Sequence, residues 1–193
     1  ITTGIQNTIM GSIAGDALTD ADYNVALGYS ALSADTKGSR NVAIGYQAFA
    51  VANRSSPANV ESVAVGYQAG FDTTDGIRNT LMGAFAGQDI TGGARNTCLG
   101  YNAGVSLTTG DQNTCLGFEA NVASASANNS FTLGNSDVTV LRCQQTSISS
   151  LSDARDKTDI IDLPYGLDFI NKTRPVQFKW NIRNAKETST YNG

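Results

Sequence analysis

A glycine that returns at a nearly fixed interval constrains this chain more than any other feature of its sequence. The intervals between successive copies are 17, 17, 21, 17, 17, 17 and 17 residues. Self-similarity at a fixed period is the signature of a repeat architecture, so we expect a stack of about eight similar coils. The repeated glycines are Gly11, Gly28, Gly45, Gly66, Gly83, Gly100, Gly117 and Gly134.

Each repeat carries the same short pattern around its glycine. The three residues before the glycine are apolar or β-branched, as in Val42–Ile44, and predict a strand of about five residues that is buried on both faces. Their middle member is mostly small, and their last member is always large and aliphatic, as expected for a core. A strand with two buried faces needs a partner outside its own coil, and another copy of the chain is the simplest one.

The remaining positions of the repeat predict turns and ladders. A second small turn residue stands seven residues before each glycine, so 17 residues suffice for two short strands and two turns. An asparagine or serine stands four residues before each glycine, and we expect these side chains to stack and to hydrogen-bond the turns, a structural role. Five aromatic residues follow glycines and predict either a cross-strand ladder or a row that stacks on sugars: Tyr29, Tyr46, Tyr67, Tyr101 and Phe118.

The one long interval, between Gly45 and Gly66, contains four extra residues. We expect them to bulge out as a loop around Arg54–Ala58. This loop would be the most distinctive external feature of the rod. If the chain recognises a receptor at all, this loop and the exposed turns are the expected place.

Composition and charge exclude several classes of protein. An apolar fraction of 40% with 16% charged residues argues against disorder. A net charge of −4 without clustered Lys and Arg predicts no nucleic-acid partner. The absence of an apolar run of 18 residues predicts no membrane insertion. The chain begins without Met or a leader, so we expect a fragment of a longer protein.

No metal site or cofactor is expected, because the chain contains no histidine, the commonest metal ligand and general base. Three cysteines do not make a disulfide framework in a chain of this size. Cys98 and Cys115 occupy the same position in successive repeats. They are either small buried hydrophobes or, in an oxidising compartment, a disulfide.

The repeats resemble those of a known family of fibrous proteins. Asn41–Ala48 and Ser62–Ala69 are similar to the head repeats of trimeric autotransporter adhesins and to repeats in phage tail fibres, and the match covers about residues 4 to 137. The resemblance implies an all-β rod, a left-handed parallel β-roll in which three chains associate side by side. We therefore assign residues 1–140 to a repeat shaft or head with 17-residue coils.

The composition changes after the last repeat. Residues 141–152 predict a serine-rich linker, and residues 153–193 predict a small α+β piece with a short helix before Pro175 and a strand over Val176–Trp180. The stretch Leu151–Lys157, with the hydrophobic residues that follow it, resembles the start of the C-terminal intramolecular chaperone of endosialidases and phage tail fibres. In that family the domain helps three chains to assemble and then removes itself. We expect residues 153–193 to be the N-terminal part of this domain, truncated at Gly193.

The resemblance also implies a site for autoproteolysis. It assigns Ser152 and Lys157 as a catalytic Ser-Lys dyad, Asp153 and Arg155 as assisting residues, and the Ser152–Asp153 bond as the cleavage site. The chemistry is sound, because a serine without a histidine needs another base, and a lysine can serve when burial or a nearby cation lowers its pKa. On residue types alone, a solvated charged turn is the competing interpretation. No turnover enzyme is expected in the repeats.

These observations predict the host-attachment segment of a homotrimeric bacteriophage tail fibre, located in the virion. Its expected partners are two copies of itself, other fibre or tail proteins, and a host surface glycan or protein. One alternative is the head of a bacterial trimeric adhesin at the cell surface, which predicts a heptad stalk downstream. A distant third is part of a polysaccharide depolymerase, which requires paired carboxylates in a groove. The scattered aspartates do not form such a pair: Asp16, Asp22, Asp72, Asp75 and Asp111.

Overall fold

The computed structural model describes residues 3–52, 58–142 and 144. The chain divides into two units, Ile1–Arg142 and Cys143–Gly193, and the first is described here. It contains ten short strands: β1 (Thr8–Met10), β2 (Val25–Leu27), β3 (Gly38–Ser39), β4 (Val42–Ile44), β5 (Ala58–Asn59), β6 (Val63–Val65), β7 (Thr80–Met82), β8 (Thr97–Leu99), β9 (Thr114–Leu116) and β10 (Phe131–Leu133). Among the described residues there is no helix.

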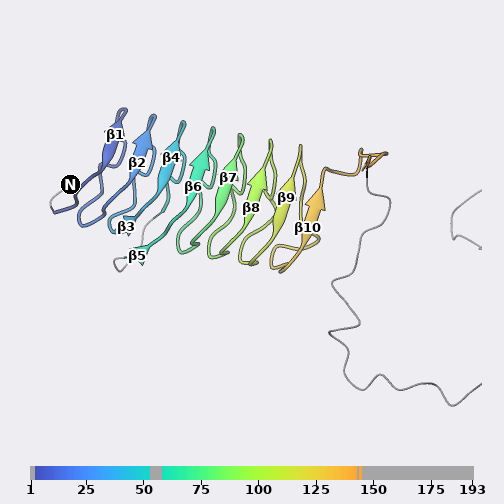
Figure 1. Cartoon of the computed structure of the whole chain (residues 1–193). Helices are drawn as coiled ribbons and strands as arrows, with labels where there is room; N and C mark the ends of the chain where they lie inside the picture. Colours follow the sequence, from blue (N-terminus) through green and yellow to red (C-terminus); the bar gives the residue numbers. More distant parts are fainter. Residues whose placement is uncertain (1–2, 53–57, 143, 145–193) are drawn as a thin grey trace, which may run out of the picture. The chain divides into compact units, whose positions relative to one another are not determined.

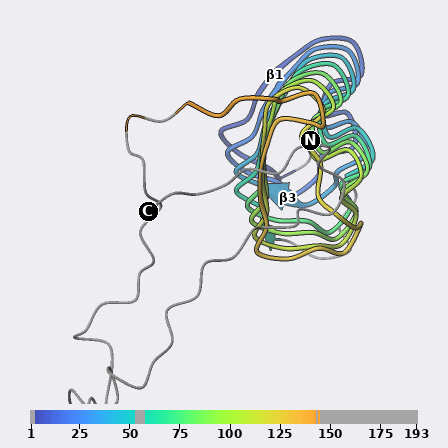
Figure 2. The same ribbon diagram turned by 90° about the vertical axis from the view of Figure 1, so that its right-hand side faces the viewer.

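Eight of these strands form one parallel sheet that runs the length of the rod (Figure 1). Their order is β1-β2-β4-β6-β7-β8-β9-β10, and each strand pairs with the strand one coil away, as Val25 pairs with Val42. Viewed along the axis, the coils lie one behind another (Figure 2). The predicted all-β repeat rod with 17-residue coils is therefore confirmed. Its left-handed sense and the trimer stay predictions, and the α+β piece lies outside the described residues.

Each coil is built differently from the expectation in two respects. The strands span three residues, not five, and their burial is one-sided: Ala43 is fully buried, whereas Val42 and Ile44 are half-buried. Alternation explains this, because a narrow coil has one interior and can take only the middle side chain. Within the coils that the structure describes, the predicted second strand forms only as the β3–β5 pair. Elsewhere the coils are joined by turn hydrogen bonds.

In five coils the interior of the rod is filled by one large side chain at either of two positions. In three coils a glycine is followed three residues later by a large buried aliphatic residue: Gly15 and Leu18, Gly87 and Ile90, Gly104 and Leu107. In the second and third coils the glycine is replaced by Leu32 or Phe49, and the later residue shrinks to Asp35 or Ala52. Exchanging the two positions conserves the filled volume, which close-packed interiors require.

A ladder of buried asparagines connects the coils, as predicted. Asn96 donates from Nδ2 to the carbonyl oxygen of Gly110 at 2.8 Å, and its Oδ1 accepts from the backbone N–H of Asn113 at 2.9 Å. Asn24 and Asn79 make the same two kinds of bond. Each asparagine thus satisfies a turn carbonyl and a backbone N–H of the next coil, so its repeated geometry is structural.

The repeated glycine is needed where neighbouring coils meet. Gly45 has φ of 129°, and a Cβ atom on it would lie 2.4 Å from the carbonyl oxygen of Gly66. Both the backbone conformation and the close approach exclude a side chain.

Candidate functional site

A row of aliphatic side chains lies on the outer face of the eight-stranded sheet and is not covered within a single chain. The third residue of each strand points outward, and three of these side chains are strongly exposed: Met10 at 70%, Met82 at 45% and Leu133 at 45%. The middle position occupies the interior of the coil, so the core expected at this last position does not form within a single chain. The row consists of Met10, Leu27, Ile44, Val65, Met82, Leu99, Leu116 and Leu133.

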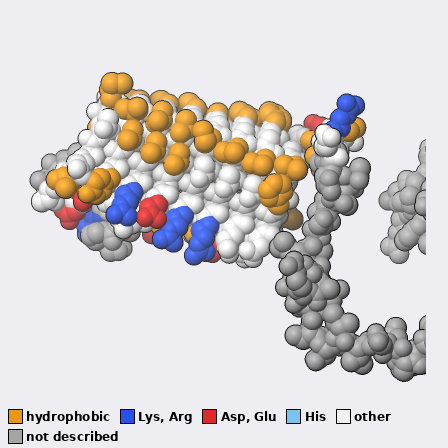
Figure 3. Space-filling view, viewed as in Figure 1, with side chains coloured by type: hydrophobic (Ala, Val, Ile, Leu, Met, Phe, Trp, Pro, Cys, Tyr) orange, Lys and Arg blue, Asp and Glu red, His pale blue; other side chains and the backbone are white. Residues whose placement is uncertain are grey.

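A second row on the same face is apolar only in part. The first strand residue is valine in β2, β4 and β6 and threonine in β1, β7, β8 and β9. The space-filling view shows hydrophobic side chains in lines along the rod, with charged side chains gathered below them (Figure 3). The face is thus a long apolar strip with a charged border.

The aromatic residues that follow the glycines form a ladder. Tyr46 stacks on Tyr29 and on Tyr67, with ring centroids 5.3 and 5.0 Å apart and interplanar angles of 14° and 6°. Phe85 continues the ladder with edge contacts to Tyr67 and Tyr101. Phe85 was not predicted as part of the ladder, because it stands two residues after its repeat glycine, whereas the other rings stand one residue after theirs. Neighbouring rings cover one another's faces, which favours the structural ladder over sugar stacking.

The long interval interrupts the rod between β4 and β6. Gly38 pairs with Ala58, 20 residues on, and Val42 pairs with Val63, 21 residues on. Relative to a period of 17, three extra residues therefore precede β5 and the fourth lies between β5 and β6. The predicted bulge placed all four around Arg54–Ala58. Residues 53–57 lie outside the described part of the chain.

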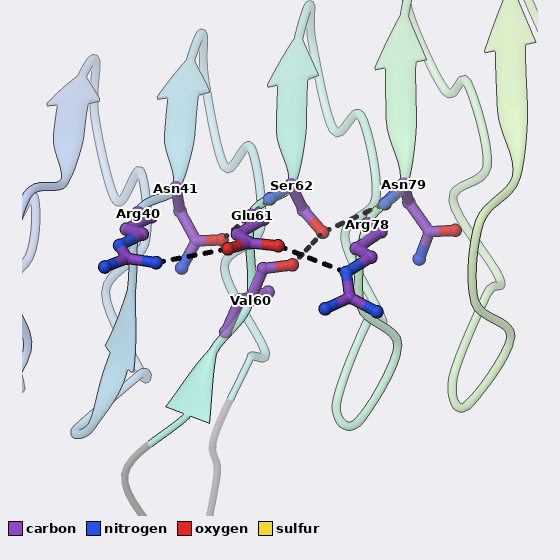
Figure 4. Close-up of polar contacts among 7 residues, drawn as sticks. All are labelled: Arg40, Asn41, Val60, Glu61, Ser62, Arg78 and Asn79. Carbon is purple, nitrogen blue, oxygen red and sulfur yellow. Dashed lines mark hydrogen bonds and ion pairs between the residues drawn. The ribbon is translucent and has the colours of Figure 1, made fainter.

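Charged side chains line the interrupted coils at the foot of the strands (Figure 4). Glu61 Oε1 accepts from Arg40 Nη1 at 3.2 Å, and Glu61 Oε2 accepts from Arg78 Nε at 3.1 Å. The hydrogen bond from Arg78, followed by that from Arg40, holds the pKa of the Glu61 carboxyl below its usual value. One carboxylate thus bridges two arginines across three successive coils.

The asparagine ladder breaks at the same place. Asn41 Nδ2 is buried and has no hydrogen-bond partner, and its Oδ1 accepts from Ser62 N–H at a long 3.4 Å. Ser62 replaces the next asparagine: its hydroxyl donates to the carbonyl oxygen of Val60 at 3.2 Å and accepts from Asn79 N–H at 3.1 Å. A narrow gap that is too small for a water molecule lies beside Asn41 and is lined also by Leu32, Phe49, Ala52 and Val60.

The two repeat cysteines carry no reactive site. Cys98 and Cys115 are register partners in β8 and β9, and both are free and buried. Their thiol–thiol hydrogen bond raises the pKa of Cys98, as burial also does, and lowers the pKa of Cys115. The interpretation as small buried hydrophobes is confirmed, because both side chains are fully buried and free.

Carboxylates of the described coils hold neighbouring turns through backbone hydrogen bonds. Asp22 and Asp111 accept hydrogen bonds from the backbone N–H groups of Ile5 and Ala94, each at 2.8 Å. The pKa of Asp89 is raised by burial and by the neighbouring Asp72. Over residues 3–52 and 58–142, no group of three or more His, Cys, Asp or Glu side chains could hold a metal. No helix in this part is long and apolar enough to cross a membrane.

The Glu61 bridge gives a pH-dependent contribution to stability. Because the pKa of Glu61 is lowered on folding, the contribution is complete above the unfolded pKa and is lost as pH falls through the folded pKa. We expect Glu61→Gln to lower the melting temperature slightly at pH 7 and not at pH 3, since this exposed pair is screened by solvent. Thermal unfolding of the variant and the unmodified chain at the two pH values measures this difference in melting temperature. An equal loss at both would contradict the role of the charge.

The predicted dyad lies outside the described residues, so no geometry is assigned to Ser152, Asp153, Arg155 or Lys157. The fold defines a repeat solenoid, and the chain continues after it into the segment that carries this motif. A family model described as chaperone of endosialidase matches residues 152–192, which are 41 of the 193 residues.

This match confirms the predicted resemblance of the C-terminal segment. It begins at the serine of the motif and includes Lys157. Searches of curated proteins and of solved structures each gave no match. The resemblance of the repeats to adhesin heads and tail fibres stays a prediction.

Proposed function

We propose that this chain is a segment of a homotrimeric bacteriophage tail fibre that serves host attachment, and that its C-terminal segment directs assembly of the three copies. The observation that carries the proposal is the outer sheet face, with an outward aliphatic residue in every strand of the sheet. The same chain carries the segment similar to the chaperone of endosialidase.

The apolar strip is long enough to need a covering partner. Eight strands at a spacing of about 4.8 Å make the face about 34 Å long. Contiguous apolar patches beyond a few hundred Å² on a soluble protein mark interaction sites. A second rod with the same period fits along the strip, since both surfaces repeat at the same spacing.

An assembly segment is physically useful for such a rod. Contacts between parallel chains are non-local, so the entropy of bringing the chains together must be overcome before any apolar burial stabilises the contact. A segment that gathers the copies at one end lowers this entropy loss. The family match also favours the fibre over an adhesin head, which would place a heptad stalk after the repeats.

Within this proposal the hydroxyl of Ser152, with Lys157 as its base, promotes hydrolysis of the Ser152–Asp153 peptide bond: the C–N bond breaks, water completes the carboxyl group of Ser152, and the amino group of Asp153 leaves with a proton. Lys157 acts as the general base in place of histidine, and the guanidinium of Arg155 keeps the lysine deprotonated by lowering its pKa. Asp153 supplies the assisting carboxyl group beside the cleaved bond.

Cleavage is tested by mass spectrometry of the full-length chain. We expect the unmodified chain and Ser150→Ala to yield a fragment that ends at Ser152, because Ser150 is a nearby serine without a role. Ser152→Ala and Lys157→Ala should stay intact, since each removes one half of the dyad. Equal processing in all four chains would discard the dyad.

The assembly role is separated from cleavage by the same set of variants. If the C-terminal segment gathers three copies before it is cut, uncleaved Lys157→Ala should still reach the same oligomeric mass as the unmodified chain. A folded monomer in the unmodified chain would contradict the proposal as a whole, whatever the outcome of cleavage.

A further inference from the structure

Three tyrosines of the ladder stack on one another at the surface of the rod. Tyr29, Tyr46 and Tyr67 follow successive glycines, and Tyr46 stacks nearly parallel to both neighbours at 5.3 and 5.0 Å. Their side chains are 47%, 42% and 46% exposed. Tyr101 differs, because its two ladder neighbours are Phe85 and Phe118.

We propose that Tyr29, Tyr46 and Tyr67 form an oxidative modification site at which Tyr46 is joined to a neighbour as an intrachain dityrosine. The oxidant class is a peroxide turned over by a haem peroxidase. Each phenol loses one electron and one proton to give a phenoxyl radical. Two radicals then form one carbon–carbon bond between ring carbons ortho to the oxygens.

The step balances in atoms and electrons. The two coupled ring carbons lose their hydrogens as the rings regain aromaticity, and both phenol oxygens end protonated. In total, two tyrosines and one hydrogen peroxide give one dityrosine and two waters. The ladder favours coupling, because the two rings are already in contact and little further conformational entropy is lost when the radicals meet.

The position of the site gives the cross-link a consequence. The closest stack, Tyr46 on Tyr67, bridges the interrupted coil, where Asn41 Nδ2 lacks a hydrogen bond. A covalent bond across this coil closes a loop that contains the four extra residues, and loop closure restricts the unfolded chain. The cross-link should therefore raise the melting temperature by fastening the rod where its ladder is broken. This inference does not rest on the proposed attachment function.

The experiment treats the native full-length chain with hydrogen peroxide and horseradish peroxidase, then maps tryptic peptides by mass spectrometry. Trypsin cuts after Lys37, Arg40, Arg54 and Arg78, so each of the three tyrosines lies in a different peptide. The expected product is the Tyr46 peptide joined to the Tyr29 or Tyr67 peptide with the loss of two hydrogens. It should come from chains that keep monomer mobility in a denaturing gel.

Two conservative variants decide the outcome, and both keep the ring stack. Tyr46→Phe should abolish the intrachain product, because Tyr29 and Tyr67 are then separated by a phenylalanine. Tyr101→Phe should leave the yield unchanged. Undiminished intrachain dityrosine in Tyr46→Phe would overturn the proposal, as would cross-links only between chains or no dityrosine in the unmodified protein.

Discussion

Replacing Ile44 and Leu99 together by aspartate will leave the rod folded and prevent its assembly. Both side chains are half-buried members of the outward aliphatic row, in β4 and β8. In one chain the new carboxylates reach water, so we expect a loss of about 1 kcal/mol of stability for each. In an assembled rod they would be buried without a partner, which weakens association by several kcal/mol and therefore more than about 100-fold.

The control carries one new carboxylate outside the strip. Thr109→Asp places a carboxylate on an exposed turn of a neighbouring coil, and it should assemble like the unmodified chain. Circular dichroism verifies the fold of each variant, and sedimentation velocity reports its size. Normal assembly of the Ile44→Asp, Leu99→Asp chain would show that the strip is not the contact between copies.

Replacing Asn96 by alanine will destabilise the rod far more than replacing Asn41. The change removes the bonds of Asn96 to Gly110 and Asn113 and leaves a buried carbonyl and a buried N–H unpaired. At roughly 1–3 kcal/mol for each of the two buried unsatisfied groups, the expected loss is about 2 to 6 kcal/mol. Asn41 already has one unpaired Nδ2 and one long bond. Its replacement should therefore lower the stability by about 1 kcal/mol or less.

Denaturant unfolding of the two variants measures this difference directly. Asn24→Ala serves as a second intact-ladder control, because Asn24 makes both ladder bonds at 2.9 and 2.8 Å. Equal destabilisation at positions 41 and 96 would mean that the interruption leaves the ladder's energetics intact. The result would then contradict the assignment of this coil as the weak point of the rod.

The period of the sequence was enough to predict the rod, its coil length and the asparagine ladder. These features depend on residues that recur at one phase, so each copy reinforces the others. The repeated glycines, such as Gly45, could be recognised for the same reason. Only glycine allows neighbouring coils to approach so closely at positive φ.

Features that depend on the width of the coil were not predictable. The period does not reveal how many side chains fit inside, and the outward position of Leu27 and Ile44 follows from an interior that takes only Ala26 or Ala43. The exchange that moves the large side chain to Phe49 is a matter of volume, not of pattern. A signal did exist in the sequence, because Phe49 stands where Gly70 and Gly87 stand in later coils.

The interruption was located from the sequence but not resolved in detail. The count of residues gives four extra positions, whereas the division into three before β5 and one after it depends on which backbone groups pair. The isolated Nδ2 of Asn41 is a consequence of that register. The dyad of Ser152 and Lys157 rests on the sequence motif and stays a prediction, while the family match extends over residues 152–192.

Sedimentation equilibrium of the unmodified full-length chain tests the central claim most directly. If the outward aliphatic strip is the contact between three copies, the folded protein has three times the mass of one chain at every concentration at which it remains folded. A folded protein with the mass of a single chain across the same concentration range would contradict the account.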